Sequence, residues 1–366
     1  MTSVPNRVRD LIEASGLTRR AFGARIGLDE SKLSKSLSGT RRFSSVDLAR
    51  IAETCHVTVD WLLTGDTPAV SMAARTTGGS ARSALDAAAG FSATRTDLAT
   101  LGYSQQWRTP PSRRVTDRYA DEGRDLAHWA TEACDGFGSP STSEDLSSLV
   151  EAVFGVDVAV VDLDADFDGL AVSSADVKLI LLATNPLPSR QRFTLAHELG
   201  HLLAGDDQGV HLDRDVFDRA QAREPGEARA NAFASSFLMP EAVLRSAARA
   251  GITEAAFASL AWDLVVSPSA LAYRLLHLRL IDAGTCDRYK VITAAKAAHM
   301  AGRGEEFARQ VAASSTPRPP GLLMRDAYAA YETGKTTLRP YANLLGVDVD
   351  VLRDSIEADT AVDGAL

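Results

Sequence analysis

The sequence contains few cysteines and no long apolar segment. Cys55, Cys134 and Cys286 are its three cysteines, and none has a partner at CxxC or CxxxC spacing. This argues against a disulfide framework and against a thiolate zinc site. The longest apolar runs, such as Val177–Ala183, have the length of a strand, well short of the ~18 residues that span a bilayer. The first residues also lack a charged-then-apolar secretory signal, so we expect a cytoplasmic protein that does not associate with membranes.

The composition is that of a globular protein, but its charge is unevenly distributed. Of the 366 residues, 45% are hydrophobic and 24% are charged, which argues against a fibrous or globally disordered chain. Residues 1–65 carry ten Lys/Arg and seven Asp/Glu, a net charge of +3, whereas the remainder carries 29 basic and 41 acidic residues, a net charge of −12. Any contact with nucleic acid is therefore expected within the first 65 residues.

Residues 4–65 are predicted to form five short helices that include a helix-turn-helix. Thr18 can cap the second helix, Gly27 supplies a turn, and Asp29 can cap the third helix. The third helix directs short polar and basic side chains outward, which suits base edges and phosphates in the major groove. The residues predicted to contact DNA are Thr18, Arg19, Glu30, Ser31, Lys32, Ser34, Lys35, Arg41 and Arg42. The alternative is a five-helix protein-docking module with a solvated charged face.

The same region resembles the phage-repressor-like XRE family of DNA-binding domains. Gly27, Ser34, Lys35 and Gly39 stand at the positions of that family. The resemblance implies binding to an operator in double-stranded DNA. Glu30 stands where those proteins often have glutamine, so no base preference is implied.

The most specific motif is His197-Glu-Leu-Gly-His201, which lies in a predicted helix over residues 190–204. Histidines four residues apart lie on one helix face about 5–6 Å apart, so both imidazoles can reach one cation. Glu198 follows the first histidine and can accept a proton from water at that cation. This is the HExxH pattern of zinc peptidases, which makes Zn²⁺ the expected cofactor. The alternative is a surface helix with two solvated histidines and a glutamate.

A catalytic zinc ion usually has three protein ligands and one open position. Asp207, His211 and Glu227 are the candidates for the third ligand. Glu227 begins a second predicted helix, residues 227–238, whose apolar residues would pack against the HExxH helix. Because an unpaired buried carboxylate is costly, this placement favours Glu227.

Two blocks of the sequence together resemble the ImmA/IrrE family of metallopeptidases. The first spans residues 192–201, and the second spans residues 227–240 with the sequence EARANAFASSFLMP. The resemblance covers about residues 145–280. It implies that Glu227 is the third zinc ligand of a gluzincin-like HExxH…E site. It also implies a repressor-type protein as the substrate, in stress responses or in the induction of mobile elements.

The predicted reaction is hydrolysis of a peptide bond, with Glu198 as the base that deprotonates the attacking water. A further group must stabilise the oxyanion that develops on the carbonyl. His211, Tyr273 and Arg274 are the candidates, although His211 is more simply interpreted as a surface histidine in a loop.

These patterns predict a mostly helical α+β chain with four parts. Residues 1–65 form the all-α helix-turn-helix head, and residues 66–114 form a linker that is weakly helical in its second half. Residues 115–285 form a zincin-like domain, in which a small sheet packs on the HExxH helices. Its helix-turn-helix-like segment at 253–281 is expected to pack beside them rather than to read DNA. Residues 286–366 form an all-α region that could dock a partner or a second copy of the chain. The β-rich runs are residues 156–163, 169–173 and 177–183.

The leading hypothesis is a homodimeric transcriptional regulator that is nucleoid-associated when bound to DNA. It would hydrolyse a peptide bond in a repressor, or in itself, and so relieve repression. The alternative is a non-catalytic regulator whose zincin domain senses a metal or a ligand. Glu198 favours the enzyme, because a sensor needs no base beside the metal.

Overall fold

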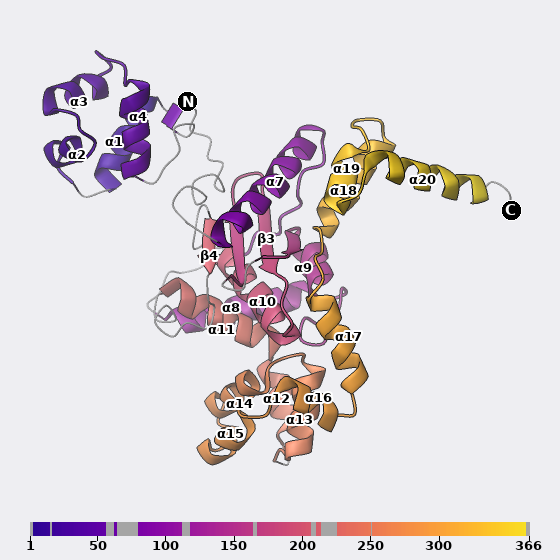
Figure 1. Ribbon diagram of the computed structural model, residues 1–366. Helices are drawn as coiled ribbons and strands as arrows, with labels where there is room; N and C mark the ends of the chain where they lie inside the picture. The colour runs from indigo at the N-terminus through magenta and orange to yellow at the C-terminus, as the bar shows by residue number, and fades with distance from the viewer. Residues whose placement is uncertain are drawn as a thin grey trace. The chain divides into compact units, whose positions relative to one another are not determined.

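The computed structural model describes residues 3–14, 17–55, 62–63, 80–111, 118–163, 167–205, 210–213, 225–249 and 251–363. Contacts divide the chain into two compact units, residues 1–89 and 90–366, and each is described by itself. Helices predominate, and one small sheet lies in the second unit (Figure 1). The predicted mostly helical α+β fold is therefore confirmed.

The first unit begins with four helices around an apolar core. Thr18, Asp29 and Ser44 cap the second, third and fourth helices, each by accepting a hydrogen bond from a backbone N–H of the first turn. The side chains of Phe22 and Ile51 are fully buried between these helices. The helices are α1 (Val4–Ala14), α2 (Arg19–Arg25), α3 (Glu30–Leu37) and α4 (Ser45–Thr54). Most of the predicted fifth helix lies outside the described residues.

The turn between α2 and α3 depends on two glycines. Gly27 has a φ of +67°, in the left-handed region that favours glycine. A Cβ atom on Gly23 would lie 2.8 Å from the carbonyl oxygen of Leu28, so only glycine lets α2 lie this close to the turn. These contacts set the helix-turn-helix geometry that the sequence predicts.

The second unit contains a four-stranded sheet with the order β1-β3-β2-β4. β1 and β3 are parallel, whereas β2 is antiparallel to both of its neighbours. The first three strands were predicted, but β4 was not, because its four residues carry no strand-length apolar pattern. At the opposite edge, Arg318 and Val160 exchange two backbone hydrogen bonds of 2.8 Å, so the C-terminal region extends the sheet beside β1. The strands are β1 (Asp157–Val161), β2 (Gly169–Ser173), β3 (Lys178–Ala183) and β4 (Val210–Asp213).

Helices cover the sheet and share one large apolar core with it (Figure 1). α10 packs against β2 and β3, and α11 packs against both α10 and α8. The core also takes side chains from α13 and α14, the helix-turn-helix-like segment, which therefore has a packing role as predicted. The helices up to this segment are α7 (Ser80–Thr100), α8 (Tyr119–Ala133), α9 (Leu146–Phe154), α10 (Pro188–Ala204), α11 (Pro225–Leu238), α12 (Glu241–Ala247), α13 (Glu254–Asp263) and α14 (Pro268–His277).

The rest of the second unit is helical, as predicted for residues 286–366. Its helices are α15 (Ala283–Tyr289), α16 (Ala294–Met300), α17 (Gly304–Ser314), α18 (Gly321–Glu332), α19 (Arg339–Leu345) and α20 (Val349–Asp363). Within the described part of the chain, no helix taken alone has the length and apolarity to cross a bilayer. α13 and α14 pass that test only as a pair, bent by 108° between them.

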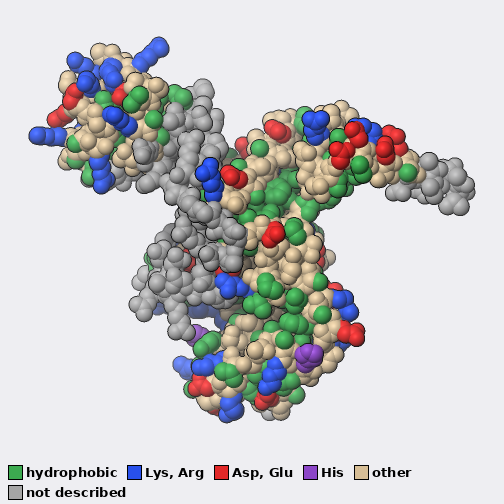
Figure 2. Space-filling view, in the orientation of Figure 1, with side chains coloured by type: hydrophobic (Ala, Val, Ile, Leu, Met, Phe, Trp, Pro, Cys, Tyr) green, Lys and Arg blue, Asp and Glu red, His purple; other side chains and the backbone are tan. Residues whose placement is uncertain are grey.

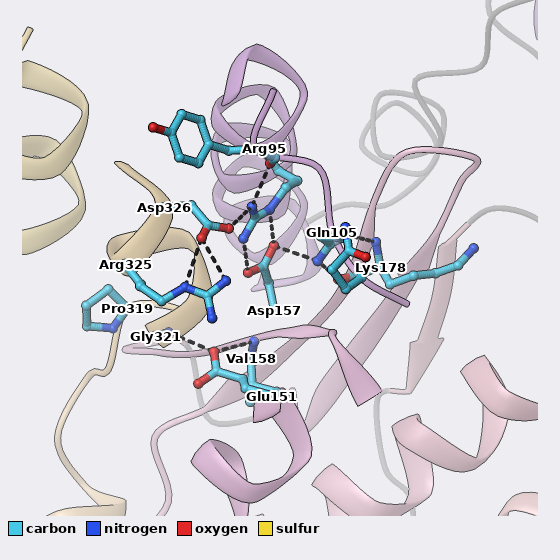
Figure 3. A network of polar contacts seen from close by, with 12 residues as sticks. Arg95, Gln105, Glu151, Asp157, Val158, Lys178, Pro319, Gly321, Arg325 and Asp326 are labelled. Atoms are coloured by element: carbon cyan, nitrogen blue, oxygen red, sulfur yellow. Dashed lines mark hydrogen bonds and ion pairs between the residues drawn. The ribbon is translucent and has the colours of Figure 1, made fainter. Parts of the chain in front are cut away.

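A buried arginine connects three distant parts of the second unit (Figure 3). Arg95 on α7 is 1% exposed. It donates to both carboxylate oxygens of Asp157 on β1, at 2.7 and 2.6 Å, and to Asp326 on α18 at 2.6 Å. Gln105 donates a further hydrogen bond of 2.8 Å to Asp157. The forked guanidinium suits such bidentate contacts, and the cluster holds α7 and α18 against the sheet.

This cluster changes the interpretation of the predicted linker at 66–114. Residues 80–100 form the continuous helix α7, and Gln105 contacts the sheet through both Asp157 and the backbone of Lys178. The second half of the segment is thus part of the folded unit from residue 90 onward. The weak apolar pattern of α7 did not indicate this, because its strongest anchor is a buried charge.

We expect Arg95→Met to lower the free energy of unfolding of the second unit by about 3–5 kcal/mol, because two buried carboxylates would lose their counter-charge. Urea unfolding of the full chain, followed by tryptophan fluorescence, measures the loss. Arg82→Met, an exposed arginine on the same helix, is the matched control and should change stability by less than ~0.5 kcal/mol. A loss below ~1 kcal/mol for Arg95→Met would contradict the assigned role of the cluster.

Candidate functional site

α10 places the three residues of the HExxH motif in the interior of the second unit. Pro188 occupies its first turn, and Gly205 ends it with a φ of +66°, which are favourable helix start and stop residues. His197 and Glu198 are 0% exposed, and His201 is 3% exposed. The surface-helix alternative for this motif is therefore wrong.

The first half of α10 is fixed by a buried arginine. Arg192 donates from Nη1 to the carbonyl oxygen of Ser143 at 2.6 Å, and from Nη2 to the carbonyl oxygen of Pro140. Burial lowers the pKa of Arg192 to about 10, so it remains protonated near neutral pH. The loop between α8 and α9 is thereby held against the helix that carries the motif.

Glu227, in the first turn of α11, meets both histidines. Its Oε2 lies 3.4 Å from His197 Nε2, and its Oε1 lies 3.3 Å from His201 Nε2. The two Nε2 atoms are 3.1 Å apart. The three residues, all buried, could hold a metal ion with ligand atoms within 4.8 Å of one another. Among the residues that the structure describes, Glu227 is the candidate for the third ligand that lies at the histidines.

These separations suit a small tetrahedral cation. Ligand atoms at about 2.0–2.1 Å from a tetrahedral zinc ion lie roughly 3.3–3.4 Å from each other. The three separations of 3.1, 3.3 and 3.4 Å fall close to that value. A carboxylate with two imidazoles is also a donor set that zinc accepts. The residues present therefore fit the metal that the motif implies.

Two glycines allow α11 to come this close. A Cβ atom on Gly200 of α10 would lie 3.0 Å from Phe233 Cδ1 and 3.3 Å from Ala230 Cα. On the other side of α11, a Cβ atom on Gly123 of α8 would lie 2.3 Å from the carbonyl oxygen of Arg229. α11 is therefore packed between two helices at positions where neither can carry a side chain without a shift.

Glu198 faces the sheet at a third glycine. A Cβ atom on Gly169 of β2 would lie 3.2 Å from Glu198 Oε1 and 2.7 Å from Thr194 Cγ2. The preceding residue, Asp168, accepts two hydrogen bonds from Arg190 on α10, at 2.9 and 2.6 Å. This ion pair fixes the start of β2 against α10, and the absence of a side chain at Gly169 leaves room for the Glu198 carboxylate.

The candidates for oxyanion stabilisation are less well placed. Arg274 donates to Ser236 Oγ at 3.2 Å, and Ser236 lies nine residues along α11 from Glu227, or about 13 Å at 1.5 Å per residue. Tyr273 is 45% exposed and lies under the ammonium of Lys290, 6.0 Å from the ring centroid. None of the contacts described for Tyr273 and Arg274 joins either residue to the histidines.

The remaining candidates lie in a region that is only partly described. His211 lies in β4, where it pairs with Ala171, so the expectation of a loop at this position is corrected. β4 is short and forms only because β2 presents it with a free edge. Asp207, the other alternative for the third ligand, lies outside the described residues.

The predicted DNA-facing side of α3 is exposed. Five of the predicted residues lie on this helix with exposed side chains, while Leu33 and Leu37 are buried in the core of the head. The five are Glu30, Ser31, Lys32, Ser34 and Lys35. Thr18, Arg19 and Arg42 are exposed as well. Figure 2 shows Lys and Arg side chains projecting from several parts of the head, so positive charge is not confined to α3.

Two of the predicted phosphate contacts already have acidic partners. Lys32 lies 3.1 Å from Asp29 in an exposed pair. Arg41 is half-buried, 2.8 Å from Asp47, and it also donates to Ser36 Oγ at 2.9 Å. Burial would raise the pKa of Asp47, but the hydrogen bonds from Ser44 and the contact with Arg41 outweigh it and lower the pKa. Arg41 therefore acts first as a structural link between α3 and α4.

Sequence reasoning missed the residues that position the site rather than form it. Gly169, Gly200 and the Asp168–Arg190 pair carry no motif of their own. The sequence predicts that the helix with Glu227 packs against the HExxH helix, but only the structure shows that the two helices meet at Gly200. The Gly200 position inside a predicted amphipathic helix was the one available signal of a close helix contact.

Fold and site together define a helix-turn-helix DNA-binding domain joined to a domain of the metallopeptidase class. Residues 6–64 match the helix-turn-helix domain family, and residues 153–276 match the family described as the IrrE N-terminal-like domain. The resemblance seen in the sequence is thereby confirmed, and this class implies a metal cofactor.

Two curated relatives are named as radiation response metalloproteases. The chain is 37% identical over 136 residues to the radiation response metalloprotease IrrE of Deinococcus radiodurans, a match that covers 36% of this chain and 40% of the relative. It is 30% identical over 149 residues to the radiation response metalloprotease IrrE of Deinococcus deserti, which covers 39% of this chain and 51% of the relative. The chain thus spans about half the length of these relatives or less.

Gly200→Ala should weaken zinc binding about tenfold, because a methyl group here pushes α11, and with it Glu227, away from the histidines. Competition with a chromophoric chelator measures the affinity. The control is Gly90→Ala on α7, where a Cβ atom meets nothing within 4 Å. Unchanged zinc affinity in Gly200→Ala would show that the α10–α11 spacing does not set the site.

Lys35→Ala combined with Arg42→Ala should reduce affinity for a random-sequence DNA duplex and lower the slope of log K against log salt by about 2, since each lost phosphate contact removes about 0.9. Fluorescence anisotropy over a salt series measures both quantities. Lys296→Ala with Arg309→Ala removes the same charge from the second unit and should leave the slope unchanged. Equal slopes for the two double variants would refute the assignment of α3 to the groove.

Proposed function

We propose that this chain is a DNA-binding transcriptional regulator whose IrrE-like domain is a zinc-dependent peptidase acting on a repressor-type protein. The observation that carries this proposal is the buried cluster of His197, His201 and Glu227, with Glu198 beside it. The names of the two relatives, both radiation response metalloproteases, support a role in a stress response.

The proposed metal ligands are the imidazoles of His197 and His201 and the carboxylate of Glu227. When bound, zinc supplies a Lewis acid that polarises the substrate carbonyl and makes water easier to deprotonate. Glu227 lies in the first turn of α11, on a separate helix from the two histidines.

Glu198 is the proposed general base and acid. It takes a proton from the attacking water as the water oxygen bonds to the carbonyl carbon. It then gives this proton to the amide nitrogen as the C–N bond breaks, so the products are a carboxyl group and an amine. Gly169 leaves space for the carboxylate on the sheet side, and the Arg190–Asp168 pair holds β2 in place.

In this proposal, the helix-turn-helix head binds an operator and thereby brings the peptidase to that site on the DNA. A repressor bound at the same operator would be presented to the peptidase at high effective concentration, which raises cleavage without tighter contacts between the two proteins. We propose a homodimer, because helix-turn-helix proteins commonly bind two half-sites about one helical turn apart. In this scheme the protein acts in the cytoplasm on nucleoid DNA, and self-cleavage would use the same site.

Glu198→Gln should retain about one zinc ion per chain but lose peptidase activity by ~10²–10⁴-fold, because the amide cannot take the proton from water. Elemental analysis of the purified full chain measures zinc. Mass spectrometry of new protein N-termini, in cells that produce each variant, measures cleavage and identifies the substrate. Glu227→Ala should lose both zinc and cleavage.

Glu305→Gln, an exposed glutamate on α17, is the matched control and should behave like the natural chain. If the natural chain binds zinc but its cells show the same N-termini as cells with Glu198→Gln, the peptidase proposal is wrong. That result would favour the non-catalytic regulator that senses metal or a ligand.

A further inference from the structure

A second feature lies at the N-terminal part of α10, four to ten residues before His197. An apolar pocket of about 230 Å³ opens between the start of α10, the end of α11 and the turn that joins α13 to α14. Its walls are mainly apolar, and they include an exposed leucine and a half-buried aromatic ring. The lining residues are Leu187, Ser189, Arg190, Phe193, Met239, Val266, Ser267 and Ala270.

The pocket adjoins the candidate metal centre through a single side chain. The ring of Phe193 lies 6.3 Å from the imidazole of His197, measured between centroids. Phe193 precedes His197 by four residues, so both point to the same side of α10. A chain segment with its carbonyl at the metal centre could thus place a neighbouring side chain in the pocket, along the face of α10 that carries Phe193 and His197.

The size and charge of the pocket specify what it can take. Its volume is below the ~300–1,000 Å³ of sites that enclose whole small molecules, and it suits one large side chain. Among the described lining residues, Arg190 alone is charged, and its guanidinium is already paired with Asp168 at 2.6 Å. An apolar group can therefore bind without stripping water from an uncompensated charge.

We infer that this pocket is the specificity site of the peptidase, which accepts a large apolar side chain next to the bond to be cut. The inference rests on the proposed function and extends it to the substrate, a peptide segment with a residue such as leucine or phenylalanine beside the cleavage point. Leu187, Phe193 and Ala270 are the residues that determine this preference.

The test uses two hydroxamates, which bind zinc but are not cleaved. Acetohydroxamate and 4-methylpentanohydroxamate differ by the four carbons that would enter the pocket. Calorimetry with the zinc-loaded full chain should show the larger compound binding on the order of 100-fold more tightly, as expected when about four carbon groups leave water. Zinc content is measured on the same samples.

Variants test whether the tighter binding of the larger hydroxamate arises in the pocket. Leu187 is the N-cap of α10 and makes no side-chain cap bond, so Leu187→Ser removes one wall while supplying a good cap. It should reduce the advantage of the larger compound by about 3–10-fold. Ala270→Phe fills the pocket and should abolish the advantage. Val243→Ser, with 40% exposure against 49% for Leu187, is the control outside the pocket and should leave the advantage intact.

The outcomes separate this inference from the proposed function. If the chain holds zinc and binds both hydroxamates equally, the pocket is not a specificity site, but the metal centre stands. An advantage that Leu187→Ser and Ala270→Phe leave unchanged refutes the pocket in the same way. If the chain takes up no zinc and binds neither compound, the proposed function is wrong, and the pocket assignment is wrong with it.

Discussion

The close packing of α11 against α10 is the contact on which the rest of the site depends. Two histidines on one helix leave a catalytic zinc site one protein ligand short, and here the third candidate ligand comes from a separate helix. Gly200 permits the approach from α10, and Gly123 lets α8 press α11 from the other side. Glu227 thereby lies 3.3–3.4 Å from the two imidazoles. Helix packing, rather than loop conformation, thus builds the candidate metal centre.

In the second unit, segments before and after residues 153–276 stabilise the sheet on which α10 packs. Arg95 links α7 to β1 and α18, and Arg318 extends the sheet beside β1. The sheet against which α10 lies is therefore stabilised by segments that flank the IrrE-like region. The C-terminal helices are in this sense part of the same folded body and not an appended module. A charge cluster buried this deeply is intolerant of single changes.

The structures of the helix-turn-helix head and of the second unit could be predicted from the sequence to different degrees. In the head, the caps Thr18 and Asp29 and the turn at Gly27 follow directly from local residue preferences, so its helices could be placed from the sequence. The structural role of Arg41 could not be predicted in this way, because its partner Asp47 lies on another helix. In the body, three strands and the HExxH helix have clear patterns, whereas β4 forms only by pairing with the edge of β2.

The amino-acid sequence alone determined the helix that carries His197, Glu198 and His201. On a helix, histidines four residues apart lie on the same face, so both can reach one cation. The spacing of apolar residues also predicted the buried helix that carries Glu227, although this helix begins at Pro225. Tertiary structure alone decided that these helices touch at Gly200, that Gly169 lies against the Glu198 side chain, and that Arg274 contacts Ser236. Such contacts join residues tens of positions apart, and local preferences carry no information about which surfaces meet.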